Sequence, residues 1–171
     1  MAQAVIGSGW KRAHALVHRI CEIWALLGGA VLMGIVLVNA ISISLDILAN
    51  KPFPGDFELT EIGVAVAAFC FLPLCQITGS NVSADLFTAK ASKFQILMMK
   101  LISGLVALGF SALLLWRMWE GLWGYLEYEE VTAILNIPIW MAFIPCLMSL
   151  GLLVAAAFLS IVDMFGTRQR A

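Results

Sequence analysis

The chain has 171 residues, 62% of them hydrophobic and only 12% charged, with a formal net charge of −1. Soluble domains carry about 45–50% apolar and about 25% charged residues, so this composition excludes an ordinary soluble domain. The mean hydropathy of +0.97 and the absence of a basic run predict one membrane domain over residues 1–171, with lipid and no nucleic acid as partner.

The N-terminal stretch predicts an amphipathic helix at the membrane surface. Apolar residues recur at helical spacing from Trp10 to Trp24, and basic side chains fall on the other faces. This pattern is typical of a helix in the headgroup layer, which we expect over residues 1–22, before the chain turns into the membrane. His14 and His18 lie four residues apart, but no third ligand is near, so interfacial solvation explains them better than a metal pair.

The first predicted span covers residues 23–45, which contain no charged side chain. A bilayer core about 30 Å thick needs roughly 20 such residues. A basic start followed by an apolar run is also typical of a signal peptide, but the run continues past Ala40, so we expect an uncleaved helix. The polar connector that follows holds two prolines and a glycine, which break the helix.

The second span, expected over residues 60–82, is bordered by carboxylates. Glu58 and Glu61 stand at its start, three residues apart and therefore on one helix face, and Asp85 follows its end. Apart from cysteines, the residues between Glu61 and Asp85 carry no ionisable group. Acidic groups at the edges of an apolar run are typical of a span whose ends reach water.

The third and fourth spans are expected over residues 95–118 and 138–162. The third requires the side chains of Lys100 and Arg117 to extend to the two interfaces. The fourth belongs to the longest uncharged run, with a kink expected near Pro145. Between them, tryptophans form one helical stripe, which favours rings at the headgroup level over a box for stacking a sugar or cofactor.

The distribution of basic residues predicts the orientation. Lysines and arginines gather in the N-terminal tail, in the connection between spans two and three, and in the C-terminal tail, whereas the two other loops hold only Lys51 and Arg117. Basic residues stay on the cytoplasmic side. Both termini are therefore expected in the cytoplasm, with the acidic loops facing outward.

The spans lack the groups that chemistry or transport by this chain alone would need. Every Asp, Glu, Lys and Arg lies near an expected span edge, whereas a carrier needs a polar group at mid-membrane. Paired histidines for haem and exported cysteine pairs for a disulfide oxidase are also missing, and the four cysteines are expected as buried thiols. We therefore expect no enzyme, no cofactor, and no catalytic, substrate-binding or metal site, but a helical subunit that supports another protein.

Three motifs carry a resemblance to a known family: Gly55–Glu61 (GDFELTE), Gly79–Phe87 (GSNVSADLF) and Leu135–Trp140 (LNIPIW). The chain resembles the small membrane subunit of tripartite ATP-independent periplasmic (TRAP) transporters, the DctQ-like proteins. The likeness covers nearly the whole chain. Asn81 stands where the family pattern often has a histidine.

The resemblance implies a partner-dependent role in the bacterial inner membrane. Family members pair with a large membrane subunit that carries the substrate and sodium sites and moves like an elevator. A periplasmic binding protein delivers the solute, usually a carboxylate. The small subunit is then expected to enlarge the static scaffold. A self-contained four-helix membrane protein, either a channel-like oligomer or an enzyme anchor, is the alternative, and the substrate is not encoded here.

Six residues of these motifs are candidates for a partner interface or a structural role. Glu58 and Glu61 pair with basic residues of a partner in one hypothesis and are simply solvated in the other. Asp85 caps the next helix through backbone amides or pairs with Lys90. Pro138 and Trp140 are expected to shape and anchor the start of the fourth span. The candidates are Glu58, Glu61, Asn81, Asp85, Pro138 and Trp140.

Overall fold

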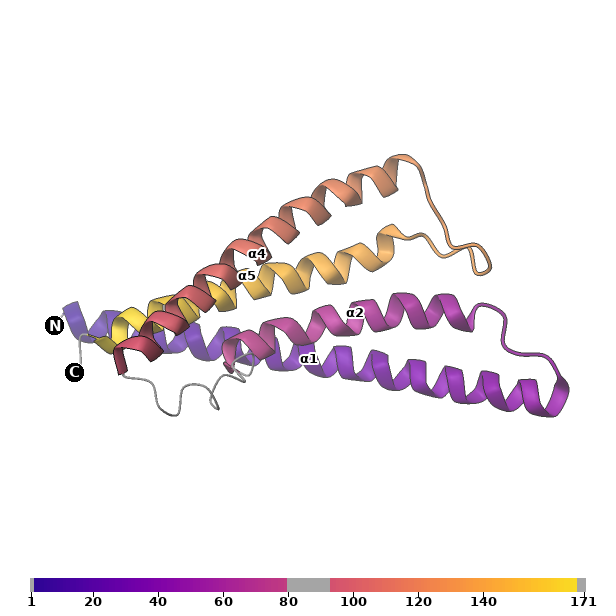
Figure 1. The fold of residues 1–171 in the computed structure, drawn as a ribbon, viewed down its shortest axis with the longest axis horizontal. Coiled ribbons are helices and arrows are strands. Elements are labelled where there is room, and N and C mark those ends of the chain that lie inside the picture. Colours follow the sequence, from indigo (N-terminus) through magenta and orange to yellow (C-terminus); the bar gives the residue numbers. More distant parts are fainter. Residues whose placement is uncertain (1, 80–92, 169–171) are drawn as a thin grey trace.

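The computed structural model describes residues 2–79 and 93–168, and within them the chain forms long helices and one isolated β-bridge (Figure 1). Each of the four helices contains a stretch long and apolar enough to cross a membrane, which confirms the all-α class with four spans. The helices are α1 (Ala2–Ala49), α2 (Asp56–Ile77), α4 (Lys93–Glu127) and α5 (Trp140–Arg168).

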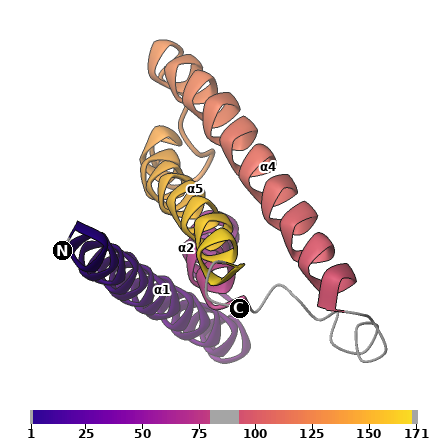
Figure 2. The same cartoon turned by 90° about the vertical axis from the view of Figure 1, so that its left-hand side faces the viewer.

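The helices form an open layer in the order α1, α2, α5, α4. The main packing contacts join α1 to α2, α2 to α5 and α5 to α4, with a smaller contact between α1 and α5. Seen from the end, α1 and α4 lie on opposite sides of the central pair (Figure 2). The start of α1 and the end of α5 lie at one end of the layer, and the α1–α2 and α4–α5 loops lie at the other (Figure 1).

Helix α1 differs from the expected interfacial helix followed by a separate span. It runs without a break from Ala2 to Ala49, so the change of direction expected near residue 22 is absent. The sequence contains no proline in this range. An unbroken helix also satisfies every backbone N–H and C=O group where lipid offers no partner. The surface location of residues 1–22 remains a prediction.

The other helix ends lie a few residues from the expected ones. Helix α2 begins at Asp56 and ends at Ile77, just before Gly79, which has a φ of 68°. Helix α4 continues to Glu127, so the tryptophan stripe belongs to the third span's own helix. Helix α5 starts at Trp140 and accommodates Pro145 within it.

Small residues allow α1 and α2 to approach closely. A Cβ atom built on Gly28 would lie 2.6 Å from the Cβ of Cys70, and one on Gly63 would overlap the side chain of Ile35. Gly63, Ala67, Cys70 and Pro73 form the buried stripe of α2. Close backbone approach through small residues is a main source of helix association in membranes.

A polar junction joins three helices inside the layer. The indole Nε1 of Trp24 on α1 donates a hydrogen bond to the hydroxyl of Ser149 on α5 at 2.8 Å. The same hydroxyl donates to the carbonyl oxygen of Pro145 at 2.8 Å and lies 3.8 Å from the Sγ of Cys70 on α2. All four cysteines are free thiols, as expected; Cys21, Cys70 and Cys146 are also buried, whereas Cys75 is only half-buried.

Candidate functional site

One carboxylate connects the two loops at the end opposite the termini. Glu58, in the first turn of α2, accepts the backbone N–H of Ile134 at 2.8 Å through Oε1 and that of Leu135 at 3.0 Å through Oε2. Hydrogen bonds that involve an ionised group are roughly twice as strong as neutral ones. We call Gly55, Glu58, Ile134 and Leu135 the loop clasp, because they hold the α1–α2 loop against the α4–α5 loop.

Gly55 contributes to the loop clasp because it has no side chain. It precedes α2 with a φ of 84°, a left-handed conformation that costs about 1–2 kcal/mol for residues with a Cβ. A Cβ atom at this position would overlap the Cγ of Leu135 and lie 2.7 Å from its Cδ1. The absence of a side chain therefore both permits the turn and leaves room for Leu135.

The α4–α5 loop is folded so that its tip presents two amides to Glu58. An isolated antiparallel bridge pairs Val131 with Pro138, and the Thr132 N–H donates to the carbonyl oxygen of Ile137 at 3.0 Å. The Thr132 hydroxyl accepts the N–H of Ile137 at 3.0 Å. Asn136 has a φ of 54°, which asparagine tolerates better than most residues. These bonds pair the N–H groups of Thr132 and Ile137 within the loop. The N–H groups of Ile134 and Leu135, at the tip of the loop, bond to Glu58 instead.

A second set of polar contacts attaches the start of α2 to α1. The buried hydroxyl of Ser42 donates to Oδ2 of Asp56 at 2.6 Å and accepts the N–H of Phe53 at 3.1 Å. One turn away, Asn39 Nδ2 donates to the hydroxyl of Thr60 at 2.8 Å. Glu58 is thus held on a helix that is itself fixed at its first turn.

The six predicted residues fall into three groups. Glu58, Pro138 and Trp140 belong to the loop region, where Pro138 forms the bridge and Trp140 is the first residue of α5. Glu61 is exposed and forms no hydrogen bond or ion pair with the described part of the chain. Asn81 and Asp85 lie outside the described residues.

Sequence reasoning missed the internal partners of Glu58. It proposed a partner protein or water, whereas the structure shows backbone amides of Ile134 and Leu135, 76 and 77 residues away. It also gave no role to Ser42. A usable signal was present, because the first and third motifs both fall in loops expected on the same side of the membrane.

The arrangement of the loop clasp indicates a structural role, because its carboxylate is used in hydrogen bonds between two parts of the chain. Its one carboxylate is occupied by two amides, and no group of three or more His, Cys, Asp or Glu suited to a metal occurs among the described residues. The arrangement fixes the relative position of the α1–α2 and α4–α5 pairs at one end of the layer.

We expect Glu58→Gln to lower the stability of the purified chain by about 1–2 kcal/mol, since the amide replaces one of the two accepting oxygens with an NH2 donor and removes the charge. The measurement is thermal unfolding in detergent, together with hydrogen exchange at the Ile134 and Leu135 amides. Glu61→Gln is the matched control, because this exposed carboxylate has no partner in the described chain. Equal melting temperatures for both variants would contradict the clasp.

Comparison with protein families matches residues 32–167 to the family described as tripartite ATP-independent periplasmic transporters, DctQ component. No curated protein and no solved structure matches the chain. The matched range contains both sides of the loop clasp and all of α2, α4 and the greater part of α5.

Proposed function

Because the chain belongs to the DctQ component family of TRAP transporters, we propose that it is the static scaffold for that transporter's large membrane subunit. The large subunit is then the sodium-coupled carrier of a carboxylate-type solute, which a periplasmic binding protein delivers. In this proposal the chain is not an enzyme and carries neither solute nor sodium itself.

The observation that carries the proposal is the position of charge in the four spans. The sequence has no Asp, Glu, Lys or Arg in residues 23–45, 62–84, 101–116 or 131–162. A carrier that works alone needs ionisable or equivalent polar groups at mid-membrane. Within the described helices, Trp24 and Ser149 form a hydrogen bond between uncharged side chains that joins α1 to α5.

The open layer also leaves broad apolar faces for a partner and for lipid. The two lateral helices, α1 and α4, each contact the rest of the molecule along one side, and large apolar side chains project from the remainder. Such faces suit both a second membrane protein and acyl chains. Examples are Val36, Ile41, Ile47 and Leu48 on α1 and Leu105, Val106, Phe110 and Leu113 on α4.

The orientation follows the distribution of lysine and arginine. We propose the bacterial inner membrane, with both termini cytoplasmic and the clasped loops on the periplasmic side. Placement of the start of α1 and the end of α5 at one end of the layer is compatible with this topology (Figure 1). The loops are then on the side where the binding protein arrives.

Co-purification from native membranes tests the proposal. A tagged chain should recover a much larger polytopic protein in stoichiometric yield. Recovery of only further copies of the chain, or of a redox enzyme, would favour the alternative of a self-contained four-helix protein. Flux of a solute or an ion through liposomes that contain only this chain would also overturn the scaffold role.

Glu61 is the residue we assign to the partner interface. It lies one turn beyond Glu58 on the same face, exposed and with no partner in the described chain, so its carboxylate is available to a basic residue of another subunit. We expect Glu61→Gln to weaken recovery of the large subunit about tenfold, the scale of one interfacial ion pair, without changing the melting temperature of the isolated chain. Unchanged recovery and uptake would remove Glu61 from the interface.

A further inference from the structure

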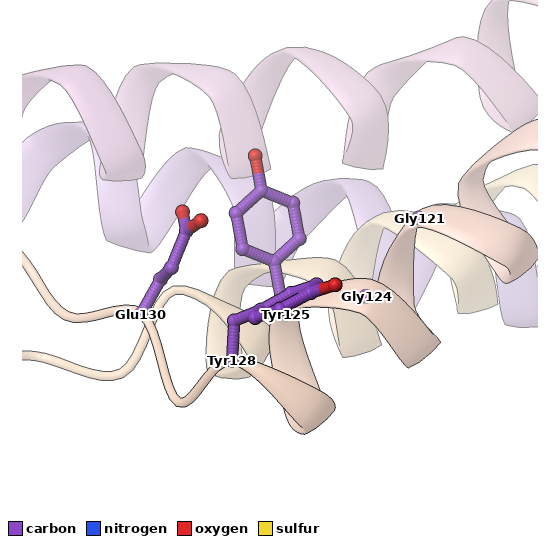
Figure 3. Close-up of a pocket in the computed structure, with 5 residues that line it drawn as sticks. All are labelled: Gly121, Gly124, Tyr125, Tyr128 and Glu130. Carbon is purple, nitrogen blue, oxygen red and sulfur yellow. The ribbon is translucent and has the colours of Figure 1, made fainter.

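A small pocket lined by aromatic rings and a carboxylate lies where α4 ends. Its volume is about 170 Å³, and its walls are two tyrosine rings, two glycines and one carboxylate. Figure 3 shows one ring standing beside the Glu130 carboxylate and the other lying nearly edge-on along the end of α4. The lining residues are Gly121, Gly124, Tyr125, Tyr128 and Glu130, and we call this the tyrosine pocket.

The tyrosine pocket lies at the level where lipid headgroups are expected. It is formed by the last turns of the span Leu101–Glu127 and the first residues after it, next to a stripe of exposed tryptophans, Trp116, Trp119 and Trp123. Trp119 and Trp123 meet edge to face with ring centroids 6.3 Å apart. Tryptophan and tyrosine gather at the boundary between acyl chains and headgroups.

Charge in the pocket favours a cation. The carboxylate of Glu130 and the hydroxyls of Tyr125 and Tyr128 form no hydrogen bond or ion pair within the described chain. Arg117, on the same helix, is already paired with Glu120 at 3.1 Å. The last turn of α4 carries no basic side chain, so the negative end of its dipole is also unneutralised.

The rings and the single carboxylate select the kind of cation. Aromatic faces attract organic cations, and quaternary or primary ammonium groups are the usual ligands of such cages. A divalent metal requires several oxygen ligands, and only one carboxylate lines this pocket. The three heavy atoms of an ethylammonium group occupy roughly 90 Å³ at the density of water, which the hollow accommodates.

We propose that the tyrosine pocket binds the ammonium group of a zwitterionic lipid headgroup, with phosphatidylethanolamine as the probe. The ammonium lies against the ring faces and is paired with Glu130, and the acyl chains follow the apolar side of α4. A Cβ atom built on Gly124 would have no described atom within 4 Å, so this wall of the pocket is open. This site is independent of the transport role.

Native mass spectrometry of the full-length chain in detergent tests the site. Equimolar phosphatidylethanolamine and phosphatidylglycerol with the same acyl chains are added, and bound lipid is counted. The expected result is a preference of roughly three- to fivefold for phosphatidylethanolamine, the scale of one exposed cation–π contact with a carboxylate. Glu130→Gln and Tyr125→Leu should each remove most of this preference, whereas Glu127→Gln, a carboxylate three residues away and outside the pocket, should retain it.

Free ethanolamine distinguishes the two sources of the same ammonium chemistry. If millimolar ethanolamine leaves bound phosphatidylethanolamine in place, the lipid is the ligand; if it displaces the lipid, the pocket recognises the ammonium group wherever it comes from. Equal binding of both lipids by the unaltered chain would overturn the proposal. A preference that survives both Glu130→Gln and Tyr125→Leu, with both variants folded by circular dichroism, would also overturn it.

Discussion

Gly28→Ala should destabilise the chain by about 1–3 kcal/mol, although alanine is the better helix former. The added methyl group would lie 2.6 Å from the Cβ of Cys70 and 3.3 Å from the backbone carbonyl oxygen of Ala67. The carbonyl belongs to the α2 helix and cannot move aside alone. Helix α2 must therefore move away from α1 along its buried stripe.

The neighbouring Gly29 provides the matched control. A Cβ atom built on Gly29 has no neighbour within 4 Å, so Gly29→Ala should gain up to about 1 kcal/mol from helix propensity. The two substitutions are chemically identical and adjacent, so the difference of about 1–4 kcal/mol reports the close approach of the helices. Thermal unfolding of both purified variants measures it, and equal melting temperatures would mean that α1 and α2 do not pack as described.

This pair also shows where sequence reasoning ends. The four spans were predictable because bilayer thickness fixes the length of an uncharged run, and α1, α2, α4 and α5 each contain a stretch long and apolar enough to cross a membrane. Nothing in the order Gly28-Gly29 tells which glycine faces α2. That choice depends on helix rotation, which follows from packing against a neighbour and not from local pattern.

The continuity of α1 and the loop clasp were missed for a related reason. A change from amphipathic to uniformly apolar composition near residue 22 suggested two helices, but composition alone does not break a helix; backbone hydrogen bonding continues unless a proline or a polar turn interrupts it. For the clasp, motif recognition identified Glu58 and the Leu135–Trp140 segment separately. Their contact depends on the three-dimensional path of two loops.

Gly55→Ala should be the most destabilising single change in the loop region, by about 2–5 kcal/mol. Two costs add: a Cβ in the left-handed conformation at φ 84° costs about 1–2 kcal/mol, and overlap with Leu135 costs about 1–3 kcal/mol. Because Leu135 would be displaced, its amide should also leave Glu58. Hydrogen exchange at that amide should accelerate together with a fall in melting temperature.

Two further variants separate the costs. Gly79 has a similar φ of 68°, and no described atom lies within 4 Å of its Cβ position, so among the described residues Gly79→Ala carries the backbone cost without an overlap. In the double variant Gly55→Ala/Leu135→Ala the overlap is removed. Its loss of stability should therefore be about 1–3 kcal/mol smaller than the sum of the losses in the two single variants. Strict additivity of the pair, or equal losses at Gly55 and Gly79, would show that Leu135 does not pack on Gly55. Glu58 alone would then join the start of α2 to the α4–α5 loop. The reason is that Leu135 can pack its side chain against the start of α2, while its amide bonds to Glu58, only if residue 55 is a glycine.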